Sequence, residues 1–279
     1  MASCQLPQCL RIGIDPVAAH VSGFNLYWYG VLVAAGFIAA IWLGTREADR
    51  EGLDGDQVLS AILVAALFGL LGARLSYIVE NNPGHYLSPD HVAEALSLWQ
   101  GGLSFYGGIF GGVLGAWIYA ARFDLPLLRL LDLGAIMAPL GLAIGRVGNV
   151  INGDLLGYPT NGWGVEYTGT ANFLVPADAI GRTRQPVGIY EVLFDAALFA
   201  VLYWLYRRRV LRPGQLSGLF LAGWAMGQLL LQAFRTTPTG FAGLKVAQVA
   251  ALPIIAGGLW LFFRASAIGP SRQAVSRTA

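Results

Sequence analysis

Long apolar runs separated by short polar stretches dominate the pattern of this 279-residue chain. A helix needs about 20 consecutive, mostly apolar residues to cross a bilayer. Seven stretches reach this length: 25–44, 58–79, 100–121, 129–150, 187–206, 216–234 and 244–263. The pattern therefore predicts an all-α fold, a polytopic helical bundle with seven transmembrane helices.

The composition agrees with a multi-pass membrane protein. Hydrophobic residues make up 56% of the chain and charged residues only 12%. Aromatic residues gather at the ends of several stretches, as in Tyr27–Tyr29 and Tyr203–Tyr206, which is typical of the membrane–water interface. Two cysteines, Cys4 and Cys9, predict neither a disulfide framework nor a metal site. No nucleic-acid partner is expected.

The basic residues predict the orientation. Of the 18 basic residues, 11 follow the first, third, fifth or seventh stretch: Arg46, Arg50, Arg122, Arg129, Arg207, Arg208, Arg209, Arg212, Arg264, Arg272 and Arg277. Basic residues flanking spans are enriched on the cytoplasmic side, so the N-terminus is predicted outside and the C-terminus inside.

No polar linker divides the chain, which predicts a single integral-membrane domain over 1–279. The largest external loop, 151–186, is predicted to form a small cap, with a short hairpin around 163–167. A short interfacial helix is expected near 89–98.

The segment GRVGNVINGDLLG, residues 145–157, carries the strongest chemical signal. Arginine at bilayer depth is costly and usually functional, and the guanidinium of Arg146 is a planar fork of donors suited to phosphate oxygens. Gly153 and Gly157 allow tight turns and close approach to a ligand. The alternative is a helix end whose polar residues only satisfy backbone groups.

Three further groups of polar residues are expected to meet this segment in the external half of the membrane. They are Gln185–Glu191, Gln232–Arg235 and Trp28–Gly30, with Arg74 and Glu80 as possible additions. Together they predict a buried polar cavity with excess positive charge, suited to an anionic phospholipid headgroup. Glu191 alone has an equally good explanation as the structural partner of an arginine, because intramembrane charges usually pair.

Glycines recur at four-residue spacing along 107–115, at Gly107, Gly111 and Gly115. Small residues at this spacing let membrane helices pack closely, which explains most of these glycines. Packing does not explain the polar Ser104 and Tyr106 near the external end.

These motifs together resemble the prolipoprotein diacylglyceryl transferase family. Residues 145–157 are similar to the family signature Gly-Arg-x-Gly-Asn-Phe-x-Asn-Gly-Glu-x-x-Gly. The family also has counterparts, in the same order, of Trp28–Gly30, the glycine-rich 101–108, Gln185–Glu191, Arg235 and Val246–Gln248. The resemblance covers about residues 25–255.

The resemblance implies an enzyme. Members transfer the diacylglyceryl group of phosphatidylglycerol to the lipobox cysteine thiol of secreted precursor proteins, forming a thioether and releasing glycerol phosphate, as the first step of lipoprotein maturation. The implied partners are phosphatidylglycerol, these prolipoproteins and membrane lipid. The implied location is the bacterial cytoplasmic (inner) membrane. No metal and no organic cofactor is called for.

The resemblance also implies residue roles. The catalytic residues would be Arg146, Arg235, Tyr106, Asp154 and Glu191. The substrate-binding residues would be Arg146, Asn149, Asn152, Gly153, Gly157, Tyr29, Ser104 and Gln248.

The chain departs from the family pattern where protons would be handled. Many members have His at the position of Tyr106 and Glu at that of Asp154. Further departures are Gln185, Gly188, Gln232 and Thr237. Tyr106 can donate or relay a proton but is a poor base, with an ordinary pKa near about 10.

The departures leave a second function class open. The chain could be a phospholipid-binding or lipid-translocating protein on the same scaffold, without the transferase activity. A secondary transporter is less well supported because no inverted repeat is visible. An intramembrane protease lacks its usual motifs.

Overall fold

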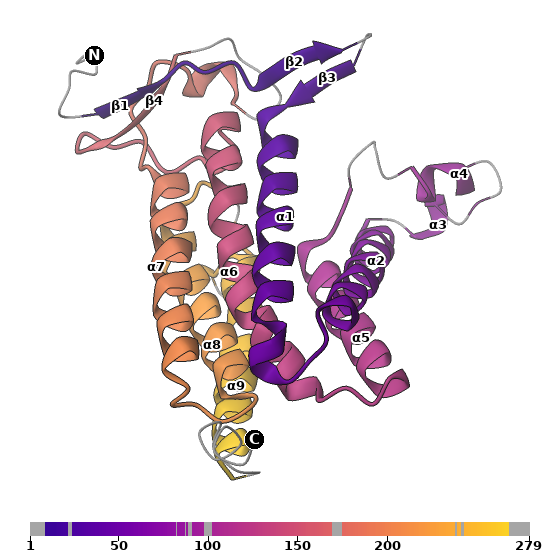
Figure 1. Ribbon diagram of the computed structural model, residues 1–279. Helices are drawn as coiled ribbons and strands as arrows, with labels where there is room; N and C mark the ends of the chain where they lie inside the picture. Colours follow the sequence, from indigo (N-terminus) through magenta and orange to yellow (C-terminus); the bar gives the residue numbers. More distant parts are fainter. Residues whose placement is uncertain are drawn as a thin grey trace. The chain divides into compact units, whose positions relative to one another are not determined.

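A computed structural model describes residues 9–21, 24–81, 83–86, 88, 91–97, 102–168, 175–237, 239–240 and 243–267. Seven long helices dominate it (Figure 1). They are α1 (Trp28–Ala48), α2 (Gly55–Glu80), α5 (Phe105–Arg122), α6 (Leu127–Asn152), α7 (Val187–Arg208), α8 (Gln215–Leu231) and α9 (Val246–Ala267). Shorter helices are η1 (Asp49–Glu51), α3 (Pro83–Tyr86), α4 (Val92–Ala95), η3 (Ala177–Ala179) and η4 (Gln232–Phe234).

The helical membrane fold predicted from the sequence is confirmed. Among the described residues, six helices are long and apolar enough to cross a membrane: α1, α2, α6, α7, α8 and α9, with η1 and η4 continuing α1 and α8. The remaining predicted span, the third stretch at 100–121, corresponds to α5, an 18-residue helix rich in glycine. At 1.5 Å per residue it is about 27 Å long, slightly less than the hydrocarbon core. The count of seven and the orientation stay predictions.

The chain forms two compact units, 1–42 with 134–279, and 43–133. In the unit of residues 43–133, α2 packs along α5 through glycines. A Cβ atom at Gly111 would collide with the carbonyl oxygen of Phe68, and one at Gly115 would lie 2.7 Å from the Phe68 Cβ. The packing role predicted for this glycine face is confirmed.

In the other unit, glycines again set the closest helix contacts. A Cβ at Gly36 on α1 would lie 2.7 Å from the carbonyl oxygen of Gly141 on α6. A Cβ at Gly218 on α8 would lie 2.6 Å from the carbonyl oxygen of Gly258 on α9. These contacts pack α1 against α6 and α8 against α9. Whether 1–279 is one domain stays a prediction.

Short strands lie at the end of the bundle where α1 begins and α6 ends (Figure 1). β1 (Cys9–Ile12) pairs in parallel with β4 (Gly164–Tyr167), and β2 (Val17–Val21) pairs antiparallel with β3 (Phe24–Tyr27). The strand expected around 163–167 exists, but the predicted local hairpin is wrong. β4 pairs instead with β1, and its Val165 forms an antiparallel bridge with Arg184. The sequence around β4 lacks the two-residue turn that is typical of a tight hairpin.

Cys9, at the start of β1, is disulfide-bonded, which corrects the expectation drawn from cysteine spacing. Cys4 lies outside the described residues.

The interfacial helix expected near 89–98 is represented by α4, Val92–Ala95. The remainder of that range lies partly outside the described residues.

Candidate functional site

The distinctive segment 145–157 begins as the last turns of α6 and leaves the helix at Gly153. Gly153 has a φ of 80°, the left-handed conformation that ends many helices. Its N–H donates to the carbonyl oxygen of Asn149 at 2.9 Å, and a Cβ there would collide with Val175. Gly153 is therefore required by the backbone path, which turns Asp154 back towards α6.

The end of this segment joins two other predicted groups through backbone hydrogen bonds. Gly157 forms an antiparallel bridge with Arg235. The Tyr158 N–H donates to the carbonyl oxygen of Phe234 at 3.1 Å, and the Gln185 N–H donates to that of Tyr158 at 2.9 Å. A Cβ at Gly157 would lie 2.6 Å from the Gln185 Cβ, so a larger residue would separate these strands.

An ionic centre lies between α6 and α7. The Arg146 Nε is 2.9 Å from the Glu191 Oε2 and 3.7 Å from the Asp195 Oδ2. The two carboxylates are one helical turn apart on α7 and fully buried, whereas the Arg146 side chain keeps 16% of its surface exposed. The guanidinium can therefore meet both buried carboxylates and a ligand arriving from outside.

The carboxylates of this centre have few hydrogen-bond donors around them among the described residues. Neither oxygen of Glu191 or of Asp195 accepts one from the described part of the chain, and the Arg146 Nε contact is ionic without hydrogen-bond alignment. Buried polar atoms are normally paired, because an unpaired one costs about 1–3 kcal/mol. The centre is thus short of donors.

A second cluster of polar side chains interacts electrostatically with this ionic centre. The Asn149 Nδ2 donates to the Asp154 Oδ2 at 2.8 Å. Burial raises the pKa of Asp154, while the hydrogen bond from Asn149 and the charges of Arg235 and Arg146 oppose that rise. Burial lowers the pKa of Arg235, and the charge of Glu191 acts in the opposite direction. The two arginines and the acidic groups therefore share one electrostatic field.

The site contains more acidic side chains than the sequence predicted. Two guanidiniums, of Arg146 and Arg235, face three carboxyl groups, of Asp154, Glu191 and Asp195. Among these five described groups, negative charges outnumber positive ones when all three carboxyls are ionised, in contrast to the predicted excess of positive charge. Protonation of one carboxyl group would remove a negative charge and so favour the binding of an anionic ligand.

Buried acceptors without donors extend to the end of α6. The Oδ1 atoms of Asn152 and Asp154 accept no hydrogen bond from the residues that the structure describes. Both side chains were predicted to act on the substrate. Their open acceptor positions suit a ligand that brings hydroxyl groups.

Two other predicted substrate-binding residues have defined places in this unit. Tyr29 lies against the segment, since a Cβ at Gly148 would be 2.9 Å from the Tyr29 Cα. Gln248 is occupied by the fold: its Oε1 accepts from the Lys245 N–H at 3.1 Å, and its Nε2 donates to the carbonyl oxygen of Leu229 at 3.0 Å. Gln248 therefore joins α9 to α8.

Four predicted residues belong to the other unit, 43–133. The Ser104 Oγ donates to the Glu80 Oε1 at 2.9 Å, and Tyr106 lies in the first turn of α5. The buried Arg74 donates to the carbonyl oxygens of Glu94, Ala95 and Gly102. Arg74 and Glu80 thus have structural partners, and the roles of Ser104 and Tyr106 stay predictions from the sequence.

Sequence reasoning missed Asp195 and Lys245. Asp195 follows Glu191 by four residues within an apolar helix, a spacing that places both on one face and could have identified it. The buried Lys245 Nζ donates to the carbonyl oxygens of Gln232 and Arg235 and lies 5.1 Å from the centre of the Tyr158 ring. The contact between Lys245 and the backbone of Arg235 forms only in the folded turn, so the sequence pattern does not predict it.

A cavity of about 10 Å³ adjoins the end of the segment, lined among others by Gly157, Tyr167, Arg184 and Gly188. It holds about one water molecule. Arg146 and Arg235 are not part of its lining, so it is not the predicted headgroup cavity.

Comparison with known proteins identifies the family. The family model of prolipoprotein diacylglyceryl transferase matches residues 16–264. The phosphatidylglycerol–prolipoprotein diacylglyceryl transferase of Verminephrobacter eiseniae is 34% identical, covering 95% of this chain and 98% of that protein. The protein of the same name from Nitratidesulfovibrio vulgaris is 35% identical, with 93% and 98% covered. The chain belongs to the prolipoprotein diacylglyceryl transferase family.

Proposed function

We propose that this chain is a phosphatidylglycerol–prolipoprotein diacylglyceryl transferase. Its relatives carry that name over nearly their full length. The observation that carries the assignment is the ionic centre of Arg146, Glu191 and Asp195, which is built on the segment most similar to the family signature. Transfer needs a phosphate site beside proton acceptors, and this centre contains both kinds of group.

The reaction displaces a phosphate from carbon. The thiol sulfur of the prolipoprotein forms a bond to the terminal glycerol carbon of the diacylglyceryl group, and the bond between that carbon and the phosphate oxygen breaks. The thiol proton passes to a base, and glycerol phosphate leaves with the electron pair. Because the nucleophile belongs to the substrate, the enzyme itself has to bind phosphate and remove a proton.

Arg146 and Arg235 are assigned to the phosphate. Guanidiniums bind phosphate oxygens through paired N–H donors, and negative charge grows on the leaving group as the C–O bond breaks. Fixed donors in a water-poor site stabilise such charge strongly. The partial exposure of Arg146 supports this role, since a fully enclosed arginine could serve only Glu191 and Asp195.

The open acceptors explain a preference for a glycerol headgroup. Phosphatidylglycerol carries two free hydroxyl groups, and the Oδ1 atoms of Asn152 and Asp154 are buried acceptors in need of donors. Hydroxyls that donate to these atoms would remove the cost of leaving them unpaired and so make headgroup binding more favourable. A headgroup without hydrogen-bond donors, such as that of phosphatidylcholine, would forgo it.

The thiol proton is assigned to the carboxylate pair of Glu191 and Asp195. Their four oxygens accept no hydrogen bond from the residues that the structure describes, and they are buried beside the proposed phosphate site. Tyr106 is proposed as a relay or headgroup ligand on the strength of its position in the sequence, where many relatives have His.

The protein is a multi-pass membrane protein. We propose the bacterial cytoplasmic membrane as its location, with the site in the external half, and lipobox-bearing precursors as the acceptor proteins. The external N-terminus and the cap over 151–186 belong to the same proposal.

The test uses purified protein in vesicles of labelled phosphatidylglycerol with a lipobox peptide. We expect peptide mass to increase by one diacylglyceryl group and glycerol phosphate to appear in equal amount. Vesicles of phosphatidylcholine, whose headgroup has no hydrogen-bond donor, should give much less product. Saturable binding of phosphatidylglycerol without product would instead establish the lipid-binding alternative.

A further inference from the structure

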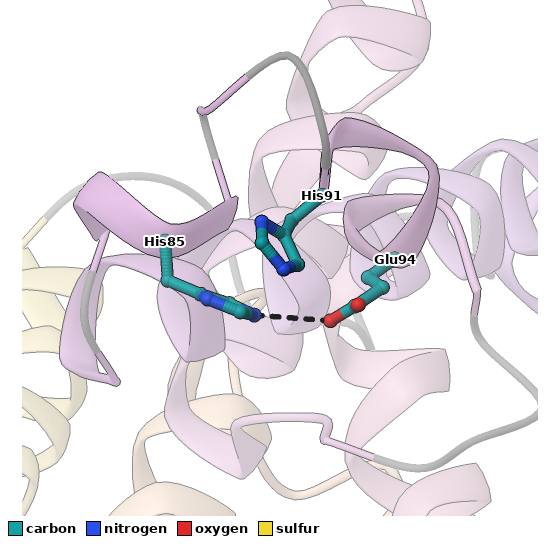
Figure 2. A group of neighbouring side chains, drawn as sticks. All are labelled: His85, His91 and Glu94. Atoms are coloured by element: carbon teal, nitrogen blue, oxygen red, sulfur yellow. Dashed lines mark hydrogen bonds and ion pairs between the residues drawn. The ribbon is translucent and has the colours of Figure 1, made fainter.

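Three metal-binding side chains converge outside the proposed transfer site, around the short helices α3 and α4. They are His85, His91 and Glu94, and one ligand atom from each lies within 4.8 Å of the others. Figure 2 shows His85 and Glu94 facing each other, with one ring nitrogen of His91 directed towards the space between them. The His85 Nε2 and Glu94 Oε2 are 3.0 Å apart.

Ser88 fixes which nitrogen of His91 is available. The Ser88 Oγ donates its hydrogen to the carbonyl oxygen of His85 at 2.7 Å, so at the His91 Nδ1, 3.0 Å away, it acts as acceptor. With the hydroxyl hydrogen on the His85 carbonyl, the matching tautomer of His91 has its proton on Nδ1 and a lone pair on Nε2. Metal-binding histidines are commonly oriented in this way, through a hydrogen bond from the nitrogen that does not bind the metal.

The backbone that carries these ligands is anchored to α2. The buried Arg74 donates to the carbonyl oxygens of Glu94, Ala95 and Gly102, and its guanidinium lies 5.6 Å from the centre of the Tyr86 ring. Tyr86 neighbours His85, and Glu94 is itself a ligand candidate. The ligand positions thus rest on a membrane helix rather than on a free loop.

A simple ion pair between His85 and Glu94 does not explain the third side chain. The rings of His85 and His91 are 4.1 Å apart, centre to centre, and inclined by 38°. Two imidazoles this close repel each other when both are protonated, whereas a cation between neutral rings and a carboxylate is attracted by all three. Ligand atoms of a tetrahedral zinc site lie about 3.3 Å apart, which small side-chain rotations would reach here.

We propose that His85, His91 and Glu94 form a zinc site that joins α3 to α4. Two imidazoles and a carboxylate are a ligand set that zinc favours, and the fourth position stays open to water. The His85 and Glu94 side chains are 39% and 46% exposed, so the ion can enter from solvent. The zinc holds the polypeptide between α2 and α5 in place and takes no part in the transfer step.

The test is zinc binding by the full chain in lipid nanodiscs, purified without a polyhistidine tag and treated with EDTA. We expect about one tightly bound Zn²⁺ per chain in competition with a chromophoric chelator. His91→Ala and Glu94→Gln should each weaken binding at least 100-fold, and Ser88→Ala about 10- to 100-fold. Glu94→Gln retains the size of the side chain and so preserves the fold.

His20→Ala is the matched control, because His20 is the remaining histidine of the chain and bonds Asn25 on the β2–β3 hairpin. It should bind zinc as the wild type does. Substituting Co²⁺ should give the visible absorption of a tetrahedral site in the wild type and not in His91→Ala. Wild-type binding no tighter than that of His91→Ala, or an equal loss in His20→Ala, would overturn the proposal.

Discussion

At the scale of single residues, Arg146 is the point where structure and chemistry meet. It contacts two buried carboxylates and remains partly exposed. A lysine would keep the charge but lose the planar fork of donors. The number and direction of donors, rather than charge alone, should therefore decide activity at this position.

Arg146→Lys is expected to lose most transferase activity, and Arg146→Ala all measurable activity. The measurement is kcat/KM for transfer from labelled phosphatidylglycerol to a lipobox peptide, with protein levels matched in the membrane. Arg184→Lys is the control, because Arg184 donates to the carbonyl oxygen of Gly157 and is not assigned to phosphate. Wild-type turnover in Arg146→Ala would remove the phosphate role.

Asp195→Asn tests the carboxylate pair. Glu191→Gln should lower kcat roughly 10²–10⁴-fold as a positioned proton acceptor is lost, and Asp195→Asn should also lower it, by less, because Asp195 is farther from Arg146. Asp178→Asn is the matched control: its carboxylate is 69% exposed and 3.8 Å from Arg184. An Asp195→Asn enzyme as active as Asp178→Asn would restrict Asp195 to packing.

Tyr106→Phe removes one hydroxyl and keeps the ring. If that hydroxyl relays the thiol proton or binds the headgroup, transfer should slow by roughly 10²–10⁴. Tyr106→His should be tolerated, since many relatives have His there. Unchanged rates in Tyr106→Phe, at normal protein levels, would leave proton transfer to the carboxylates.

At the scale of elements, the structure depends on close helix contacts made by glycine. Gly111 on α5 meets the carbonyl oxygen of Phe68 on α2, a contact too close for any Cβ. Gly112, the next residue, would place its Cβ 3.5 Å from the carbonyl oxygen of Ala65, an ordinary contact. Neighbouring glycines therefore differ sharply in their tolerance of a side chain.

Gly111→Ala is expected to destabilise the α2–α5 pair by about 1–3 kcal/mol, as overpacking does elsewhere. Gly112→Ala should be close to neutral or slightly stabilising. Thermal unfolding of the two variants in the same detergent gives the comparison. Equal melting temperatures would show that α2 and α5 do not pack as described.

The elements were largely readable from the sequence, because length and hydropathy decide membrane helices. The predicted spans agree with the helices to within a few residues at most ends; α5 begins five residues late because Gly102–Ser104 stay outside the helix. The hairpin failed because β4 pairs with β1, more than 150 residues away in the chain. Such long-range pairing leaves little local signal.

At the scale of the whole molecule, the charged groups of the site come from three separate parts of the chain: residues 145–157, α7 and the turn at Arg235. Arg146, Glu191 and Arg235 were predictable because charges within apolar segments are conspicuous. The contribution of Lys245, the structural use of Gln248 and the shortage of hydrogen-bond donors arise from tertiary contacts. The sequence pattern does not predict these features.

The predicted topology can be tested by labelling single cysteines in a background with Ser at positions 4 and 9. Asn161→Cys, in the exposed part of the cap, should react with an impermeant maleimide added to intact cells. Val210→Cys, which is 55% exposed and follows α7, should react only after lysis. The opposite pattern would reverse the orientation.

The bridge between Gly157 and Arg235 has a consequence for biogenesis. Its partners are separated in the chain by the two long helices α7 and α8, and Lys245, which secures the Arg235 turn, is made later still. Because a chain emerges from the ribosome N-terminus first, Arg146 enters the membrane well before the residues that complete its surroundings. We therefore expect a chain truncated before Lys245 to keep Arg146 on α6 but to lose the contacts that fix the Arg235 turn.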